Sequence, residues 1–200
     1  MAVRSLFATR FYEADLDAPA LLAELEDACL ALAAEDAAGR RWSREHGYRG
    51  YTSYASLNDL PVRDPRFADL AKLLSRHVAK FAEACAMDLG GRRLRLDSLW
   101  VNVLKPGGVH SAHIHPHSVV SGTFYVAVPP SAGKLKLEDP RLPMMMAAPP
   151  RRTDAPEDLR TFIYAEPKPG GLFLWESWLR HEVVAGAGKG ERISISFNYR

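Results

Sequence analysis

The second half of the chain reads as a succession of short β-strands, and this constrains the fold more than any other feature. From residue 92 onward, apolar and β-branched runs alternate with turns that contain Gly and Pro. We predict seven strands there: Leu94–Leu104, Val119–Val128, Lys134–Leu137, Thr161–Tyr164, Gly171–Trp175, Glu182–Ala185 and Arg192–Tyr199. An edge strand is expected at Leu6–Tyr12. So many short strands favour a double-sheet barrel of the jelly-roll or cupin kind.

Helical patterns occupy much of the first 91 residues. Apolar residues recur at helical spacing between Asp17, a candidate N-cap, and Asp36. A second helix starts at Asp64-Pro65 and is expected to end at Gly90-Gly91. Between them, residues 37–58 read as a loop with short strands. The predicted fold class is therefore mainly β with flanking helices that cover one face of a sheet.

Length and composition fit one soluble domain of 200 residues, with residues 1–91 packed on a barrel core formed by residues 92–200. The chain is 47% apolar and 25% charged, with a formal charge of only +2. No lysine-rich block or basic tail indicates a nucleic-acid partner. No window approaches the roughly 20 apolar residues that span a membrane.

The start of the chain, MAVRSLFATRFYEADL, lacks the apolar core of a secretory signal. Both cysteines, Cys29 and Cys85, fall in alanine-rich helical stretches and are read as free thiols. We therefore expect a cytoplasmic protein.

Histidines are concentrated between two of the predicted strands. The stretch from His110 to His117 reads HSAHIHPH and holds four of the chain's seven histidines. Residues two apart on a strand point to the same face, so His113 and His115 can reach one metal ion. His117 follows a proline that interrupts the strand, and we place it with His110 at the rim.

A third metal ligand must come from elsewhere, and His181 is the best candidate because it opens a strand. Two ligands close in sequence and one remote ligand leave coordination positions open for substrates. Trp175 and Trp178 flank the approach to His181 and are expected to be packing residues. His46 and His77 are read as ordinary hydrogen-bonded histidines.

The terminal strand, ERISISFNY, has one apolar and one polar face. Arg192 and Ser194 share their face with Ser196 and Asn198, whereas isoleucines and a phenylalanine occupy the other. A polar face inside a small barrel is costly unless it binds something. An arginine fork matches a carboxylate, and a nearby hydroxyl adds a donor. The alternative is an exposed sheet face with Arg192 in water.

In combination, these motifs resemble the iron(II)/2-oxoglutarate-dependent oxygenases, and within them a bacterial group of 2-oxoglutarate–iron oxygenases. The resemblance is strong from about residue 94 to 200 and weak in the helical part. The matching stretches are LWVNVLKPGG, HIHPHSVVSGTFYV, LEDPR, LFLWESWLRHEV and ERISISFNY.

The resemblance implies a double-stranded β-helix that holds iron(II) and uses 2-oxoglutarate as co-substrate. Decarboxylation of 2-oxoglutarate to succinate would accompany the oxidation of a substrate. By this resemblance the metal ligands are His113, His115 and His181. Arg192 would bind the distal carboxylate of 2-oxoglutarate with help from Ser194. Tyr125 and Asn102 would be further contacts near the metal or the co-substrate.

The chain departs from the resemblance at His115, where most of the wider superfamily has Asp or Glu. A neutral ligand there would leave the metal with one more positive charge and could alter the metal preference towards zinc or nickel. Alternatively, only two histidines bind iron and His115 lies behind them. Asp139 is a nearby carboxylate, but its spacing does not support it as the usual ligand.

Two other functions remain open on the residues alone. One is a cupin-like three-histidine metal dioxygenase that needs no 2-oxoglutarate, and the other is a non-catalytic metal- or ligand-binding barrel. The substrate is expected to be a small molecule or a peptide, and the irregular segment Pro140–Glu157 is a candidate lid or binding loop. No nucleic-acid or membrane partner is expected, whereas a homodimer is a further prediction.

Overall fold

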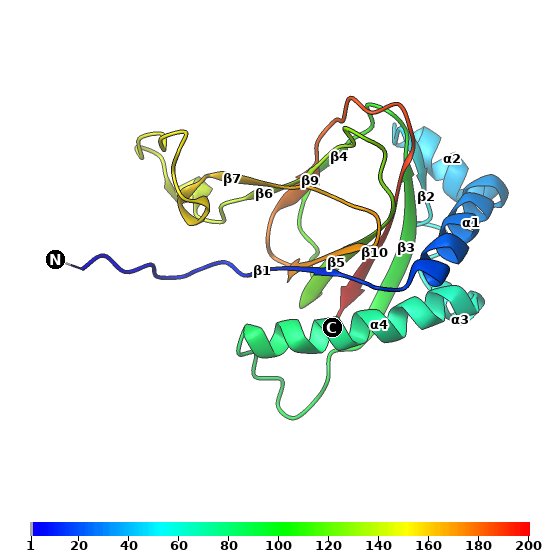
Figure 1. Cartoon of the computed structure of the whole chain (residues 1–200), viewed down its shortest axis with the longest axis horizontal. Helices are drawn as coiled ribbons and strands as arrows, with labels where there is room; N and C mark the ends of the chain where they lie inside the picture. The colour runs from blue at the N-terminus through cyan, green and yellow to red at the C-terminus, as the bar shows by residue number, and fades with distance from the viewer. Residues whose placement is uncertain (1) are drawn as a thin grey trace.

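The computed structural model describes residues 2–200 and contains two β-sheets flanked by helices (Figure 1). The strands are β1 Phe11–Asp15, β2 Gly50–Thr52, β3 Leu96–Leu104, β4 His110–His113, β5 Val120–Ala127, β6 Leu135–Glu138, β7 Phe162–Ala165, β8 Gly171–Glu176, β9 His181–Val183 and β10 Arg192–Tyr199. The α-helices are α1 Pro19–Glu35, α2 Ala37–Glu45, α3 Leu60–Arg63 and α4 Pro65–Ala84. Two short 3-10 helices, Leu142–Met144 and Glu157–Leu159, lie in the long connection between β6 and β7.

The strands form a six-stranded sheet in the order β1-β8-β5-β10-β3-β2 and a four-stranded sheet in the order β4-β9-β6-β7. Neighbouring strands in both sheets are antiparallel. The helices gather beside the larger sheet, on the side away from the smaller one (Figure 1). This arrangement confirms the predicted mainly-β architecture with flanking helices.

Residues alternate across the larger sheet between two environments. On β10, Ile193, Ile195 and Phe197 join the core that includes α1 and α4. The opposite face carries Arg192 and Ser194, which line an internal cavity. The predicted division of the terminal strand into an apolar and a polar face is therefore confirmed. The polar face is buried rather than exposed to water.

The loop expected at residues 37–58 is partly wrong, because α2 occupies its first part. Asp36 begins this helix by accepting a hydrogen bond from the Gly39 N–H at 3.0 Å. The same carboxylate accepts hydrogen bonds from Tyr51 and Ser56 at 2.9 and 2.5 Å. These bonds connect residues up to 20 positions apart, so helical periodicity alone gave little warning of this helix.

Several element boundaries also differ from the prediction. The first strand is β1, so residues 6–10 precede it instead of forming it. Ala18 is the N-cap of α1 and no side-chain cap bond is present there, so Asp17 does not cap this helix. Helix α4 ends at Ala84, and Gly90-Gly91 lie further on in a turn at φ values of +58° and +74°. Strand β4, which contains the first histidines of the cluster, was not among the predicted strands.

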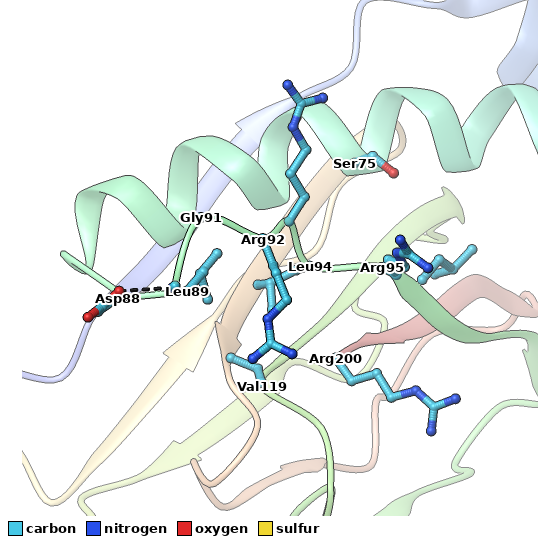
Figure 2. A pocket seen from close by; sticks show the side chains of 12 residues that line it. Ser75, Asp88, Leu89, Gly91, Arg92, Leu94, Arg95, Val119 and Arg200 are labelled. Atoms are coloured by element: carbon cyan, nitrogen blue, oxygen red, sulfur yellow. Dashed lines mark hydrogen bonds between the residues drawn. The ribbon is translucent and has the colours of Figure 1, made fainter.

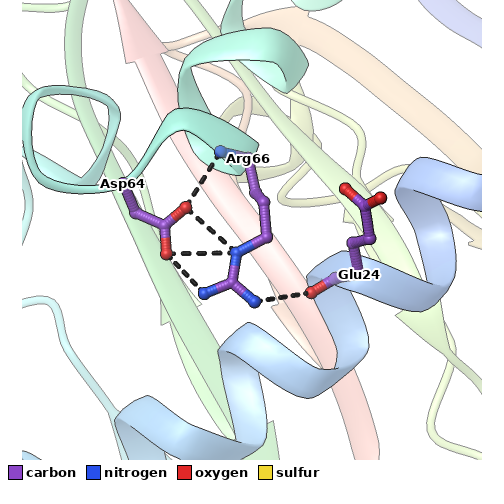
Figure 3. Close-up of polar contacts among 3 residues, drawn as sticks. All are labelled: Glu24, Asp64 and Arg66. Carbon is purple, nitrogen blue, oxygen red and sulfur yellow. Dashed lines mark hydrogen bonds and ion pairs between the residues drawn. The ribbon is translucent and has the colours of Figure 1, made fainter.

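Asp64 and Arg66 form an ion pair at the start of α4, and Arg66 also contacts α1 (Figure 3). The Asp64 side chain caps α4 by accepting the Arg66 N–H at 2.9 Å, and it also accepts the Arg66 guanidinium Nη2 at 2.6 Å. The guanidinium donates further to the backbone oxygen of Glu24 in α1 at 3.3 Å. Hydrogen bonds from Arg66 hold the pKa of Asp64 below its ordinary value of 3.8, although partial burial opposes this.

We predict that Asp64→Ala lowers the free energy of unfolding by about 1–2 kcal/mol, because it removes both the helix cap and the ion pair. Asp64→Asn keeps a cap acceptor and is expected to cost less. Because folding lowers the Asp64 pKa, the charge stabilises the protein above the ordinary pKa, and this contribution is lost as the pH falls through the folded pKa. Urea unfolding checks this, since the difference between wild type and Asp64→Asn should vanish well below pH 3.8.

Candidate metal centre

Three histidines meet where the smaller sheet faces the polar side of β10. His113 ends β4 and His181 begins β9, and the two residues pair directly across the antiparallel ladder. His115 follows the strand in a turn, held by its N–H bond to the Ser177 oxygen at 3.0 Å. One ring nitrogen from each histidine lies within 4.8 Å of the others. The strand argument for His113 and His115 was therefore only partly right, because the turn, not strand alternation, brings His115 to the group.

Every histidine of this group has its Nδ1 next to an oxygen acceptor. The Nδ1 atoms of His113 and His181 lie 2.7 and 2.8 Å from the backbone oxygens of Ser111 and Leu179. Since a backbone oxygen only accepts, the hydrogen of each neutral ring must sit on Nδ1. The Nε2 atom of each ring is then left with a free lone pair, as a metal ligand requires.

His115 reaches the same state through a side chain. Its Nδ1 lies 2.7 Å from Asn198 Oδ1. The Asn198 Oδ1 also accepts a hydrogen bond from Ser121 Oγ at 2.8 Å, and its Nδ2 donates one to Ser98 Oγ at 3.3 Å. Asn198 therefore presents an acceptor to His115 and places the ring hydrogen on Nδ1.

The lone pairs of two of these rings face each other. His115 Nε2 and His181 Nε2 are 3.2 Å apart. Two unprotonated nitrogens at this distance repel unless a cation or a proton lies between them. Ligand nitrogens about 2.1 Å from a metal ion would be about 3.0 Å apart at a right angle and about 3.4 Å apart at a tetrahedral angle. The observed separation lies between these values, so the residues fit a metal ion.

Burial keeps these imidazoles neutral. Together with a smaller effect of neighbouring histidines, it lowers the pKa of His181 to about 2 and the pKa of His115 to about 4. Burial likewise lowers the pKa of His113. A metal competes with protons for imidazole nitrogen, so rings that stay neutral near pH 7 are ready to bind one.

Arg192 is a buried cation with few hydrogen-bond partners. Its side chain is 5% exposed, and its Nε has no hydrogen-bond partner among residues 2–200. Nη1 lies 3.4 Å from Ser194 Oγ, and the guanidinium carbon lies 4.9 Å from the centre of the Tyr125 ring. The buried Tyr125 hydroxyl also lacks a partner within the described chain. A buried charge without an anion is costly, so this site fits a ligand carboxylate.

The histidines and Arg192 line one cavity, together with Ser194 and Asn102. Asn102 accepts a hydrogen bond from Thr52 Oγ1 at 2.8 Å and donates one to Ser196 Oγ at 3.1 Å. These bonds leave one amide hydrogen for a ligand. Tyr125 does not line the cavity but lies against Arg192.

Sequence reasoning missed Tyr48 as a wall of this cavity. Its ring meets the edge of His110 at 5.7 Å, and burial raises its pKa to about 12. Tyr48 lies in the connection between α2 and β2, within an aromatic-rich segment. That enrichment was its only signal, and the signal did not distinguish it from its neighbours.

The remaining candidates are resolved by their contacts. His110 stacks on His113 with ring centres 4.6 Å apart, whereas His117 is exposed in the turn after β4. Asp139 is held by Arg141 through Nε at 2.9 Å and Nη2 at 2.8 Å, and it is not part of the three-histidine group.

The expectation for the two tryptophans is half right. Trp175 is buried and packs on His181 with ring centres 4.6 Å apart. Trp178 is 47% exposed, so its interpretation as a packing residue is wrong.

A second, wider hollow of about 1340 Å³ lies between α4 and the start of β3 (Figure 2). Four exposed arginines line it: Arg92, Arg93, Arg95 and Arg200. Its one carboxylate, Asp88, accepts the Gly90 N–H at 2.9 Å, and the lining contains neither histidine nor cysteine. The metal-binding chemistry of the described chain is therefore concentrated in the histidine cavity.

Comparison with known proteins agrees with this geometry. The model of a protein family described as "Putative 2OG-Fe(II) oxygenase" matches residues 98–198, which include all three histidines and Arg192. A comparison with curated proteins found no match. Among residues 2–200, no helix combines the length and apolar character needed to cross a membrane.

Solved structures share the architecture at low sequence identity. A Pseudomonas putida prolyl-4-hydroxylase is 17% identical with a TM-score of 0.58, covering 96% of this chain and 93% of that one. The α-ketoglutarate-dependent carbocyclase SnoK from nogalamycin biosynthesis is 10% identical with a TM-score of 0.66, covering 96% and 79%. HygX from Streptomyces hygroscopicus, solved with nickel and 2-oxoglutarate, is 17% identical with a TM-score of 0.62, covering 96% and 82%. These likenesses confirm the predicted double-stranded β-helix.

We predict that His181→Ala, and equally His113→Ala or His115→Ala, weakens binding of iron(II) or nickel(II) by more than about 100-fold, because each removes a lone pair. Isothermal titration of the metal-free protein checks this. His117→Ala is the matched control, since this exposed histidine lies two positions from His115. Tight binding retained after both His113→Ala and His115→Ala would refute the centre.

Asn198→Ala is expected to weaken metal binding by about 10- to 100-fold, because it removes the acceptor that orients His115. Asn198→Asp keeps an acceptor and should bind metal more tightly than the alanine variant. Competition with a chromogenic chelator measures both affinities. Equal affinities of wild type and Asn198→Ala would show that this hydrogen bond does not tune the site.

Proposed function

Because the chain belongs to the 2OG-Fe(II) oxygenase family, we propose that it is an iron(II)- and 2-oxoglutarate-dependent dioxygenase that hydroxylates or otherwise oxidises a substrate. One observation carries this proposal. Three imidazoles with free Nε2 lone pairs and a buried guanidinium without an anion share one cavity. The first feature fits a metal ion and the second fits a carboxylate, so together they fit a metal with an acidic co-substrate.

In this proposal His113, His115 and His181 hold the iron through their Nε2 atoms. Bound iron supplies the activation of dioxygen, with 2-oxoglutarate decarboxylated to succinate. The protein orients each ring through its Nδ1 hydrogen, which is held by Ser111, Leu179 or Asn198. Three protein ligands would leave coordination positions of the metal open for the co-substrate.

Arg192 binds the distal carboxylate of 2-oxoglutarate and Ser194 adds a hydroxyl donor. Within the described chain, the guanidinium Nε has no hydrogen-bond partner, and Nη1 has only its 3.4 Å contact with Ser194. A carboxylate would therefore accept hydrogen bonds that these donors do not otherwise make. Asn102 offers its remaining amide hydrogen from the cavity wall. Tyr125 supports Arg192 from behind through its ring face.

A second candidate is a three-histidine metal dioxygenase that binds its substrate directly and needs no 2-oxoglutarate. The all-histidine ligand set favours it, because the usual carboxylate is replaced by His115. The buried Arg192 argues against it unless that substrate is itself an acid. A non-catalytic barrel that binds only a metal would have no use for Arg192, whereas one that also binds an acidic ligand would form no succinate.

The substrate is a small molecule or a peptide, and the long connection between β6 and β7 is a candidate binding loop. Its residues Met144 and Met146 are 74% and 94% exposed, which is typical of an adaptable contact surface. A homodimer stays a prediction.

The direct test is succinate formation from 2-oxoglutarate by the purified protein with iron(II) and ascorbate. Succinate is formed from 2-oxoglutarate itself, so the test does not require the identity of the substrate. We expect succinate that depends on iron and is lost in His181→Ala. Absence of iron-dependent 2-oxoglutarate binding by the wild type would refute the proposal and leave the second candidate.

Arg192→Ala is predicted to weaken 2-oxoglutarate binding by about 1–3 kcal/mol, because it removes charge-assisted hydrogen bonds to a carboxylate. Arg192→Lys should retain part of the affinity, since a lysine keeps the charge but not the fork. The control is Arg180→Ala, because Arg180 is an arginine of the same region whose side chain is 52% exposed. Calorimetric titration of 2-oxoglutarate into the metal-loaded protein measures all three, and a metal titration checks that each variant is metal-loaded.

A further inference from the structure

A chain of aromatic rings leads from the histidine group to the protein surface. The His115 ring stacks on Trp100 with centres 6.0 Å apart, at an angle of 27° between the rings. Trp100 meets Tyr54 with ring centres 5.2 Å apart. Trp100 is 3% exposed, whereas Tyr54 is 51% exposed. A proposed metal ligand is therefore joined to solvent by the two kinds of side chain that are most easily oxidised by one electron.

We propose that Trp100 and Tyr54 form a one-electron path that carries oxidising equivalents away from the metal centre, and that Tyr54 is the residue oxidised when no substrate is present. The proposal rests on the proposed function, which supplies the oxidant. Electron transfer weakens steeply with distance, so rings in contact are the favoured route through the protein.

Dioxygen and 2-oxoglutarate would give succinate and carbon dioxide. Without a substrate, two oxidising equivalents would stay unused at the centre. Trp100 gives one electron to the centre. Tyr54 then returns an electron to the oxidised indole and releases its hydroxyl proton to water. A second electron comes from a small-molecule reductant such as ascorbate. With two electrons and two protons, the second oxygen atom of dioxygen would leave as water.

The environments of the two rings set the direction of transfer. The Trp100 indole Nε1 is buried and has no partner among residues 2–200, so an oxidised Trp100 has no base to take its proton. It therefore regains an electron more readily than it loses the proton. The exposed Tyr54 ring can release its proton to water, and this step traps the oxidation at the surface.

Trp175 also lies beside the site, but its ring contacts among the described residues do not continue to an oxidisable side chain at the surface. It lies closer to a proposed ligand, with 4.6 Å between the ring centres of Trp175 and His181. Its indole Nε1 is likewise buried without a partner in the described chain. Its other ring contact is Phe11, at 6.4 Å, and a phenyl ring is much harder to oxidise than indole or phenol. Among residues 2–200, the chain through Trp100 is thus the one that ends in an exposed tyrosine next to the site.

The experiment is substrate-free turnover of the iron-loaded protein with 2-oxoglutarate, oxygen and ascorbate. Samples frozen during turnover are examined by electron paramagnetic resonance for a tyrosyl radical, and peptide mass spectrometry locates oxidised side chains. The variants are Tyr54→Phe and Trp100→Phe. Tyr164→Phe is the matched control, because Tyr164 is 52% exposed but has no aromatic ring contact within residues 2–200. Thermal melting shows whether each variant is folded.

We expect a tyrosyl radical and oxidised Tyr54 in wild type and Tyr164→Phe, and loss of both in Tyr54→Phe. Tyr54→Phe should still form succinate but lose activity several-fold faster during turnover. Succinate formation without oxidation of Tyr54 would overturn the path while leaving the proposed function intact, as would a radical that persists in Tyr54→Phe. No succinate from the wild type would refute the proposed function and the path with it, since the path would have no oxidant.

Discussion

The hydrogen bond between His115 and Asn198 joins the two sheets at the point on which the site depends. Asn198 belongs to β10 in the larger sheet, whereas His115 follows β4 of the smaller sheet. Without this bond, His115 would keep its backbone bond to Ser177 and its stacking on Trp100, but no side-chain hydrogen bond of His115 in the described chain would reach the larger sheet. The bond also decides which nitrogen of His115 carries the hydrogen, so a single contact sets both the position and the chemistry of the ring.

Strand β10 meets two demands at once. Its apolar face packs with α1 and α4 in the main core, and burial of such side chains is the dominant stabilising contribution in a domain of this size. Its polar face holds Arg192 in a buried position, which costs free energy while the guanidinium has no anion. Because both faces belong to one rigid strand between β3 and β5, the core holds the costly group in place for a ligand.

The sequence predicted those parts of the site that follow from alternation along a strand or from specific motifs. The two-residue period of the terminal strand placed Arg192 and Ser194 on one polar face, and the structure shows that this face lines the cavity. His115 joined the site for a different reason, since a turn and a distant asparagine place it. Tyr48 and α2 escaped notice because contacts with residues far along the chain fix them. Periodicity reports on local geometry, so it cannot reveal positions that only tertiary contacts define.

Replacement of the usual carboxylate by His115 changes the charge balance of the whole cavity. Among residues 2–200, the cavity lining contains no Asp or Glu, while Arg192 contributes one positive charge. A divalent metal held by three neutral imidazoles would raise this to three positive charges in a largely buried space. A dianionic co-substrate would offset two of them, one carboxylate near the metal and the other at the guanidinium. Charge would therefore couple the two halves of the site, because the metal and the co-substrate each reduce the electrostatic cost of burying the other.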